Sequence, residues 1–150
     1  MMKETPILLS MLSASRPDPG EEPQSIRTMT SGTLTEENGG YTIRYRETLQ
    51  DDTGGTVSRD VTLFVSPHRA MMESVGPYGM TMVFQRGLHY DGIYHTPFGD
   101  MPISLQTTRM SVVMDPRLGS LKVTYQLDTQ GSYATMMDIE LHWRARAGAV

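Results

Sequence analysis

The chain has 150 residues, with 13 basic and 17 acidic side chains, a formal net charge of −4 and no cysteine. A single domain over residues 1–150 is expected, without disulfides or thiolate metal sites. The acidic balance argues against a nucleic-acid or anionic membrane surface, because binding phosphates requires clustered Lys and Arg.

The N-terminus allows two interpretations. Residues 7–14 form a short apolar run that contains Ser10 and follows Thr5-Pro6. This pattern favours a first β-strand, and the alternative is a cleaved signal peptide. No apolar run approaches the ~20 residues of a membrane span. A cytoplasmic location is expected from the absence of cysteine and the poor signal segment.

The chain reads as a series of β-strands with almost no helical periodicity. Apolar and β-branched runs alternate with short connectors rich in Gly, Pro, Asp and Asn, as in hairpin proteins. This spacing predicts an all-β fold, a single antiparallel closed β-barrel of about eight to ten strands. The expected strands are residues 5–14, 26–34, 40–49, 56–65, 69–75, 78–86, 88–95, 101–114, 120–127 and 132–144.

An early hairpin can be registered from its side-chain alternation. Folding the chain about Thr53 places Tyr45 opposite Val61 and Glu47 opposite Arg59. Opposite charges that face each other on an apolar face form a cross-strand pair. Two interpretations remain open: a salt bridge at the rim, worth ~0–1 kcal/mol, or a pair in the barrel lumen that orients a ligand carboxylate or polar group.

The last hairpin predicts a barrel wall with one dry and one wet face. Odd-numbered residues in 121–127 and 133–143 are mostly apolar, while Asp138, Glu140, His142 and Arg144 are polar. In residues 101–114 the apolar positions change from odd to even numbers between Leu105 and Met110. This change predicts a β-bulge near 107–109.

The segment 94–99 is expected to form a tight corner at one end of the barrel. Pro97 pre-sets φ for a turn, Thr96 precedes it, and Gly99 supplies a positive φ. We expect Phe98 to plug this end and Tyr94 to face the lumen.

Motifs for catalysis or metal binding are missing. His68, His89, His95 and His142 lack metal-ligand spacing, and the serines lack a nucleophile elbow. The histidines are interpreted as surface or hydrogen-bonded residues, with a single axial haem ligand as the alternative. We therefore predict no catalytic residue, no metal site and no cofactor.

The methionine content offers the clearest hint of a ligand. Thirteen methionines and seven tyrosines occur in the chain. Methionine fills gaps in ordinary cores, but it also lines adaptable apolar pockets, in which tyrosine hydroxyls supply polar contacts. The ligand-binding candidates in the lumen are Tyr45, Glu47, Arg59, Met82, Tyr94 and Phe98.

Several short segments together resemble a known family. The most specific reads Tyr94-His95-Thr96-Pro97-Phe98-Gly99, and the others are residues 4–7, 31–32, 40–47, 82–87 and 105–107. In this order and spacing the chain resembles the YwiB-like proteins, small bacterial proteins of unknown function. The resemblance implies a calycin-like (lipocalin-type) β-barrel and brings no established activity. One departure is Ser74, at a position where the family commonly has arginine.

The leading functional hypothesis is a non-catalytic module that binds a small hydrophobic or amphipathic ligand in the lumen. The alternative is a ligand-free structural or protein-interaction barrel, and an enzyme or a haem binder ranks below both. The sequence also permits a homodimer, because an unclosed edge strand can pair with a second copy.

Overall fold

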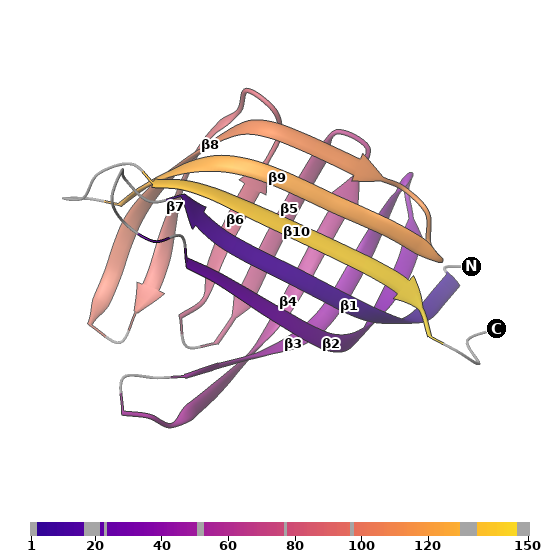
Figure 1. Cartoon of the computed structure of the whole chain (residues 1–150), viewed down its shortest axis with the longest axis horizontal. Helices are drawn as coiled ribbons and strands as arrows, with labels where there is room; N and C mark the ends of the chain where they lie inside the picture. The colour runs from indigo at the N-terminus through magenta and orange to yellow at the C-terminus, as the bar shows by residue number, and fades with distance from the viewer. Residues whose placement is uncertain are drawn as a thin grey trace.

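The computed structural model describes residues 3–16, 22, 24–50, 53–76, 78–96, 98–129 and 135–146. These residues form ten antiparallel strands closed into one barrel, which confirms the predicted fold class (Figure 1). No helix among them is long and apolar enough to cross a membrane. The strands are β1 (Lys3–Arg16), β2 (Gln24–Glu37), β3 (Gly40–Gln50), β4 (Thr56–Ser66), β5 (Arg69–Val75), β6 (Met80–Phe84), β7 (His89–Thr96), β8 (Gly99–Val113), β9 (Leu118–Thr129) and β10 (Thr135–Ala145).

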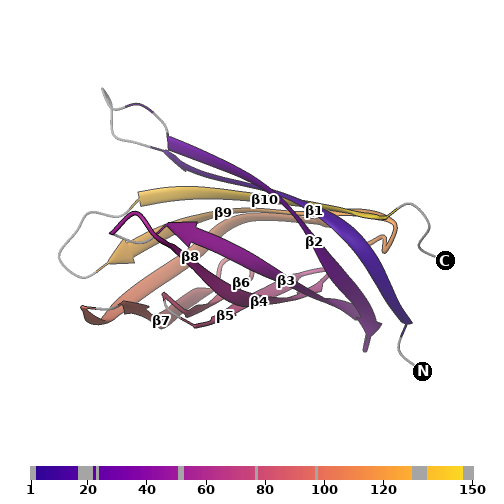
Figure 2. The ribbon, with the colours of Figure 1, turned by 90° about the horizontal axis from the view of Figure 1, so that it is seen from below.

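The barrel is a meander whose first and last strands meet. Each strand pairs with its neighbours in the chain, and β1 pairs with β10 to close the ring. Figure 2 shows a flattened barrel, with β1, β9 and β10 in one layer and β3–β6 in the other. Strand β2 crosses between the two layers, and the long strand β8 does the same on the other side. The barrel therefore has two long walls joined by two bent strands.

Gly32 marks the place where β2 meets β3. A Cβ atom there would lie 2.6 Å from the carbonyl oxygen of Arg44, so any side chain would push the two strands apart. Pairing between β2 and β3 begins at Gly32 and Tyr45 and continues to Glu37 and Gly40. Glycine thus permits the close crossing from which β2 diverges toward its own N-terminal end.

The predicted registers are confirmed. Tyr45 lies opposite Val61, and Glu47 lies opposite Arg59 in the β3–β4 hairpin. In β8 the register against β9 shifts between Thr107 and Arg109, where a bulge was expected. After this bulge the inward-facing set changes from odd to even numbers, which keeps Met110 against the core.

One end of the barrel is tightly packed. Trp143 is buried, its indole N–H donates to the carbonyl of Asp115 at 2.8 Å, and its ring meets Tyr41 edge to face at 6.2 Å. We call this the packed end. Fully buried aliphatic side chains continue the packing into the middle of the barrel; they are Ile7, Leu9, Leu34, Ile43, Leu63, Leu105, Leu121 and Leu141.

Candidate functional site

The other end of the barrel keeps its inward-facing side chains partly exposed, and we call it the open end. It comprises the end of β1, the start of β2, the β3–β4 hairpin, and the ends where β5 meets β6 and β7 meets β8. Ile26 shares the inner face of β2 with Leu34, yet Ile26 is 70% exposed whereas Leu34 is fully buried. The candidate site lies inside this end.

A charged pair forms the centre of the candidate site. Arg59 approaches one carboxylate oxygen of Glu47 through both Nε and Nη2, at 2.9 Å each. The side chains of Arg59 and Glu47 are only 13% and 19% exposed. Two opposite charges held this far from water on an inner face match the lumenal interpretation better than a rim salt bridge, although a role in ligand binding stays a prediction.

Tyr78 anchors the guanidinium from a second direction. Arg59 Nη1 donates to the carbonyl oxygen of Tyr78 at 2.6 Å. Tyr78 has a positive φ of 62°, which is uncommon for a residue with a side chain. The contacts with Glu47 and with the backbone of the turn before β6 therefore hold the arginine side chain in one orientation.

Tyr94 adds a phenol close to this pair. Its ring packs on Tyr78 with centroids 6.3 Å apart, and its backbone pairs with Met80. Burial raises the pKa of Tyr94, and Arg59 opposes this rise while Tyr78 and Glu47 add to it. Tyr94 thus lies on the inner face as expected, within electrostatic reach of the charged pair.

Tyr45 and Met82 form the floor of the candidate site. Both are almost completely buried, and the Tyr45 hydroxyl donates to the Sδ atom of Met11 at 3.9 Å. Burial raises the pKa of Tyr45, the negative charge of Glu47 adds to the rise, and Arg59 opposes it. Below them, Phe84 packs on Tyr125 with ring centroids 5.1 Å apart. The floor therefore separates the open end from the packed core.

The prediction that Phe98 plugs the barrel is wrong. Its side chain is 87% exposed, because the β7–β8 turn carries it beyond the last strand pair, Thr96 and Gly99. The turn itself is as expected: Gly99 has a φ of +123°, and the Thr96 hydroxyl donates to the carbonyl of Gly99 at 2.7 Å. Pro97 lies outside the described residues.

Sequence reasoning missed two parts of the site. It counted Tyr78 among the tyrosines but gave no sign of its positive φ or of its carbonyl contact with Arg59. It also gave no role to Ser74, whose hydroxyl bonds the backbone N and O of Met80 at 3.0 and 3.1 Å. Neither backbone contact has a sequence signal.

The outer face carries exposed His–Asp pairs rather than a catalytic triad. His89 Nε2 lies 3.0 Å from Asp91, His95 Nδ1 lies 2.8 Å from Asp100, and Ser104 donates to Asp91 at 2.6 Å. Asp91, not histidine, accepts the hydrogen bond from the Ser104 hydroxyl, so neither imidazole contacts this hydroxyl as it would in a Ser–His pair. No group of three or more metal-binding side chains is found in the described part of the chain.

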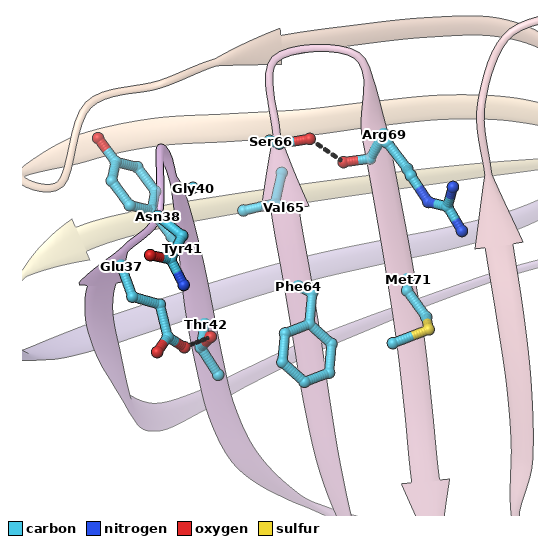
Figure 3. Close-up of a pocket in the computed structure, with 10 residues that line it drawn as sticks. All are labelled: Glu37, Asn38, Gly40, Tyr41, Thr42, Phe64, Val65, Ser66, Arg69 and Met71. Carbon is cyan, nitrogen blue, oxygen red and sulfur yellow. Dashed lines mark hydrogen bonds between the residues drawn. The ribbon is translucent and has the colours of Figure 1, made fainter.

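A separate groove lies on the outside of β3–β5, near the packed end. It has a volume of about 400 Å³. Phe64 and Met71 are cross-strand neighbours on this face, beside a hydrogen bond from Thr42 to Glu37 (Figure 3). Because these side chains point away from the lumen, the groove does not belong to the candidate site.

The fold and the lumenal site define a small, closed, all-antiparallel β-barrel protein. The chain belongs to a family described as "Domain of unknown function (DUF1934)", whose profile matches residues 12–141. A similar solved structure is titled "Crystal structure of ywiB protein from Bacillus subtilis"; it has 20% sequence identity and a TM-score of 0.82, over 97% of this chain and 96% of that one. The resemblance to YwiB-like proteins is thus confirmed. No curated protein matches the sequence.

Proposed function

We propose that this protein is a non-catalytic module that binds a small amphipathic ligand inside the open end of the barrel. The apolar part of the ligand would lie against Met80 and Met82, and its polar end would meet Tyr94 and the Glu47–Arg59 pair. Methionine suits such a surface because its flexible thioether adapts to ligands of different shape.

The observation that carries this proposal is the buried ion pair on the inner face. Taking two charges out of water is costly, and a pair of apolar residues would often be at least as stable. Glu47 and Arg59 nevertheless lie inward and are mostly buried, next to partly exposed inner side chains. A polar arrangement that is fixed in advance at a cost to folding is typical of binding sites.

The charge balance of the pair favours an uncharged polar head group. Glu47 and Arg59 neutralise each other at 2.9 Å, so neither attracts a ligand carboxylate or ammonium strongly. A hydroxyl group can donate to the carboxylate and accept from the guanidinium or from Tyr94. A medium-chain alcohol therefore suits the site better than the corresponding acid or amine.

A fluorescence titration tests this proposal. N-phenyl-1-naphthylamine is neutral and fluoresces in apolar surroundings, and we expect the wild-type protein to bind it and 1-decanol to displace it. Decanoate and decylamine should displace it less well. The Met80→Trp variant fills the lumen, and it should weaken binding of the dye about tenfold or more, which corresponds to ~1.4 kcal/mol.

Met71→Trp is the matched control, because Met71 lies on the neighbouring strand β5 but faces outward. It should leave dye binding unchanged. The proposal fails if the wild-type protein does not enhance the fluorescence, or if the two tryptophan variants behave alike.

A cytoplasmic location is part of the proposal, supported by the absence of cysteine. Cell fractionation with an antibody against the protein would test it, and recovery from an extracytoplasmic fraction would contradict it.

A further inference from the structure

Half of strand β2 pairs on one side only. Residues 24–31 pair with β1, from Ser15–Gln24 to Leu8–Ser31, and pairing with β3 begins at Gly32. Figures 1 and 2 both show the start of β2 diverging from the end of β3. Within the described residues, this half of β2 therefore presents a free backbone edge of eight residues to solvent.

This edge has little protection against pairing and carries one exposed apolar side chain on each face. Ile26 is 70% exposed on the inner face, and Met29 is 62% exposed on the outer face. Natural edge strands usually carry several charges, proline or a bulge, which prevent pairing with other chains. Residues 24–31 hold one charge, Arg27, and no proline. The facing edge of β3 is different, because it carries Arg46 and Glu47.

We propose that this half of β2 pairs antiparallel with the same half of a second copy of the chain, about a twofold axis through Thr28. The inference is independent of the ligand site. An isologous strand pair would join the β1–β2 walls of two barrels into one continuous sheet and cover Ile26 and Met29 of both copies.

The register follows from the side chains. Centring the pair on Arg27 would place it directly opposite Arg27 of the second copy, and like charges in that position repel. Centring on Thr28 instead places Arg27 opposite Met29 of the second copy, where its aliphatic stem can pack. It also pairs Ser25 with Ser31, which retains nearly the whole free edge.

Charge complementarity favours a second copy over an unrelated strand. Glu22 is exposed just before β2 begins. In the antiparallel arrangement, this end of one copy lies beside Gly32 of the other, where β3 joins β2. Arg44 pairs with Thr33 there and is exposed, whereas the neighbouring Arg46 contacts Asp60 at 3.1 Å. Glu22 of each copy would thus approach Arg44 of the other.

Cysteine cross-linking tests the register directly, because the wild-type chain has no cysteine to interfere. Directly opposite Cα atoms in an antiparallel pair lie ~4.5–5.5 Å apart, within the range that a disulfide spans. Under mild oxidation at micromolar concentration, the Thr28→Cys variant should form covalent dimers up to about a thousandfold faster than Phe98→Cys, because strand pairing raises the effective thiol concentration to millimolar. Phe98→Cys is the control on an exposed turn away from the edge.

Sedimentation velocity of the wild-type protein and of Ile26→Lys completes the test. We expect a concentration-dependent dimer for the wild type and a monomer for the variant, whose circular dichroism should be unchanged because position 26 is exposed. The proposal is overturned if the wild type stays monomeric, if it forms a complex only with a different protein, or if Thr28→Cys cross-links no faster than the control. A dimer that persists in Ile26→Lys also overturns it, since the interface then lies elsewhere.

Discussion

The two ends of this barrel follow the same alternation of inward and outward side chains, yet they differ in what the inward side chains are. At the packed end, Trp143 and Leu141 are almost completely shielded from solvent. At the open end the corresponding positions hold Glu47, Arg59 and partly exposed methionines. The alternation therefore determines which side chains face inward, while their size and polarity determine whether the interior is filled.

The divergence of β2 from β3 explains where the inward side chains change from fully buried to partly exposed. Beyond Gly32, β2 continues along β1 while β3 continues along β4. On this side the inner residues Glu47, Arg59 and Met80 are partly exposed. Small barrels are normally filled by their own side chains; here the inward side chains are fully buried at one end and partly exposed at the other.

The largest expected loss of stability comes from a substitution at the packed end. Trp143→Ala should lower the free energy of unfolding by ~3–5 kcal/mol, because it removes a buried aromatic side chain and leaves a cavity. Met80→Ala at the open end should cost clearly less, since Met80 is only partly buried. Equilibrium urea unfolding measures both, and equal losses would contradict the distinction between the two ends.

A smaller loss is expected from adding a single methyl group at the packed end. A Cβ atom on Gly119 would overlap the buried ring of Trp143. Gly119→Ala should therefore destabilise the protein by ~1–3 kcal/mol, the usual cost of overpacking a core. Thermal unfolding by circular dichroism provides the measurement, and an unchanged midpoint would show that the ring has room to move.

Two neighbouring ion pairs on one hairpin allow a matched comparison of the faces. Glu47–Arg59 faces inward, while Arg46–Asp60 faces outward with both side chains at least 70% exposed. Arg59→Met should cost ~1–3 kcal/mol because it leaves a mostly buried carboxylate without its partner. Arg46→Met should cost under ~1 kcal/mol, as exposed pairs do.

Chemical denaturation of these variants, together with the double variant Glu47→Gln/Arg59→Met, measures the coupling between the two inward charges. We expect the double variant to recover part of the stability lost in Arg59→Met. If Arg59→Met and Arg46→Met lower the free energy of unfolding equally, the lumenal pair is solvated like a surface salt bridge.

At alkaline pH, a buried tyrosine with a raised pKa should lower the stability of the folded protein. Burial raises the pKa of Tyr125 to about 12, and the negative charge of Asp138 adds to this. A raised folded-state pKa contributes stability that is complete below the unfolded value near 10 and is lost as pH rises toward 12. At pH ~10.5 we expect a loss of about 1 kcal/mol from Tyr125. Urea unfolding at pH 7 to 10.5, with Tyr125→Phe as the control, measures it; equal pH dependence in the two proteins would contradict the assignment.

The smallest expected effect is at the candidate site. Tyr94→Phe should change the free energy of unfolding by no more than ~0.5 kcal/mol, because the side chain is only partly buried. It should nevertheless weaken displacement of the dye by 1-decanol. A loss of stability above ~1.5 kcal/mol would instead identify the hydroxyl as part of a structural hydrogen bond.

Much of the fold was predictable from sequence, because side-chain alternation depends only on local backbone geometry. It placed Glu47 opposite Arg59 and located the bulge beside Thr107. The prediction for Phe98 failed, because the sequence of a turn does not show whether its aromatic side chain lies close enough to the barrel to pack against it. Side-chain alternation also gave no hint of the Tyr78 carbonyl contact or of the free edge of β2, because both depend on how distant segments diverge.

Methyl NMR of the methionines tests the central claim most directly, because those in the described part of the chain sample both faces and both ends of the barrel. With N-phenyl-1-naphthylamine as the ligand, we predict that the methyl resonances of Met72, Met80, Met82 and Met101 shift on titration. Met71 and Met29 on the outer face, and Met114 near the packed end, should not move. Shifts confined to Met29 and Met71, or a uniform absence of shifts, would contradict a ligand site inside the open end.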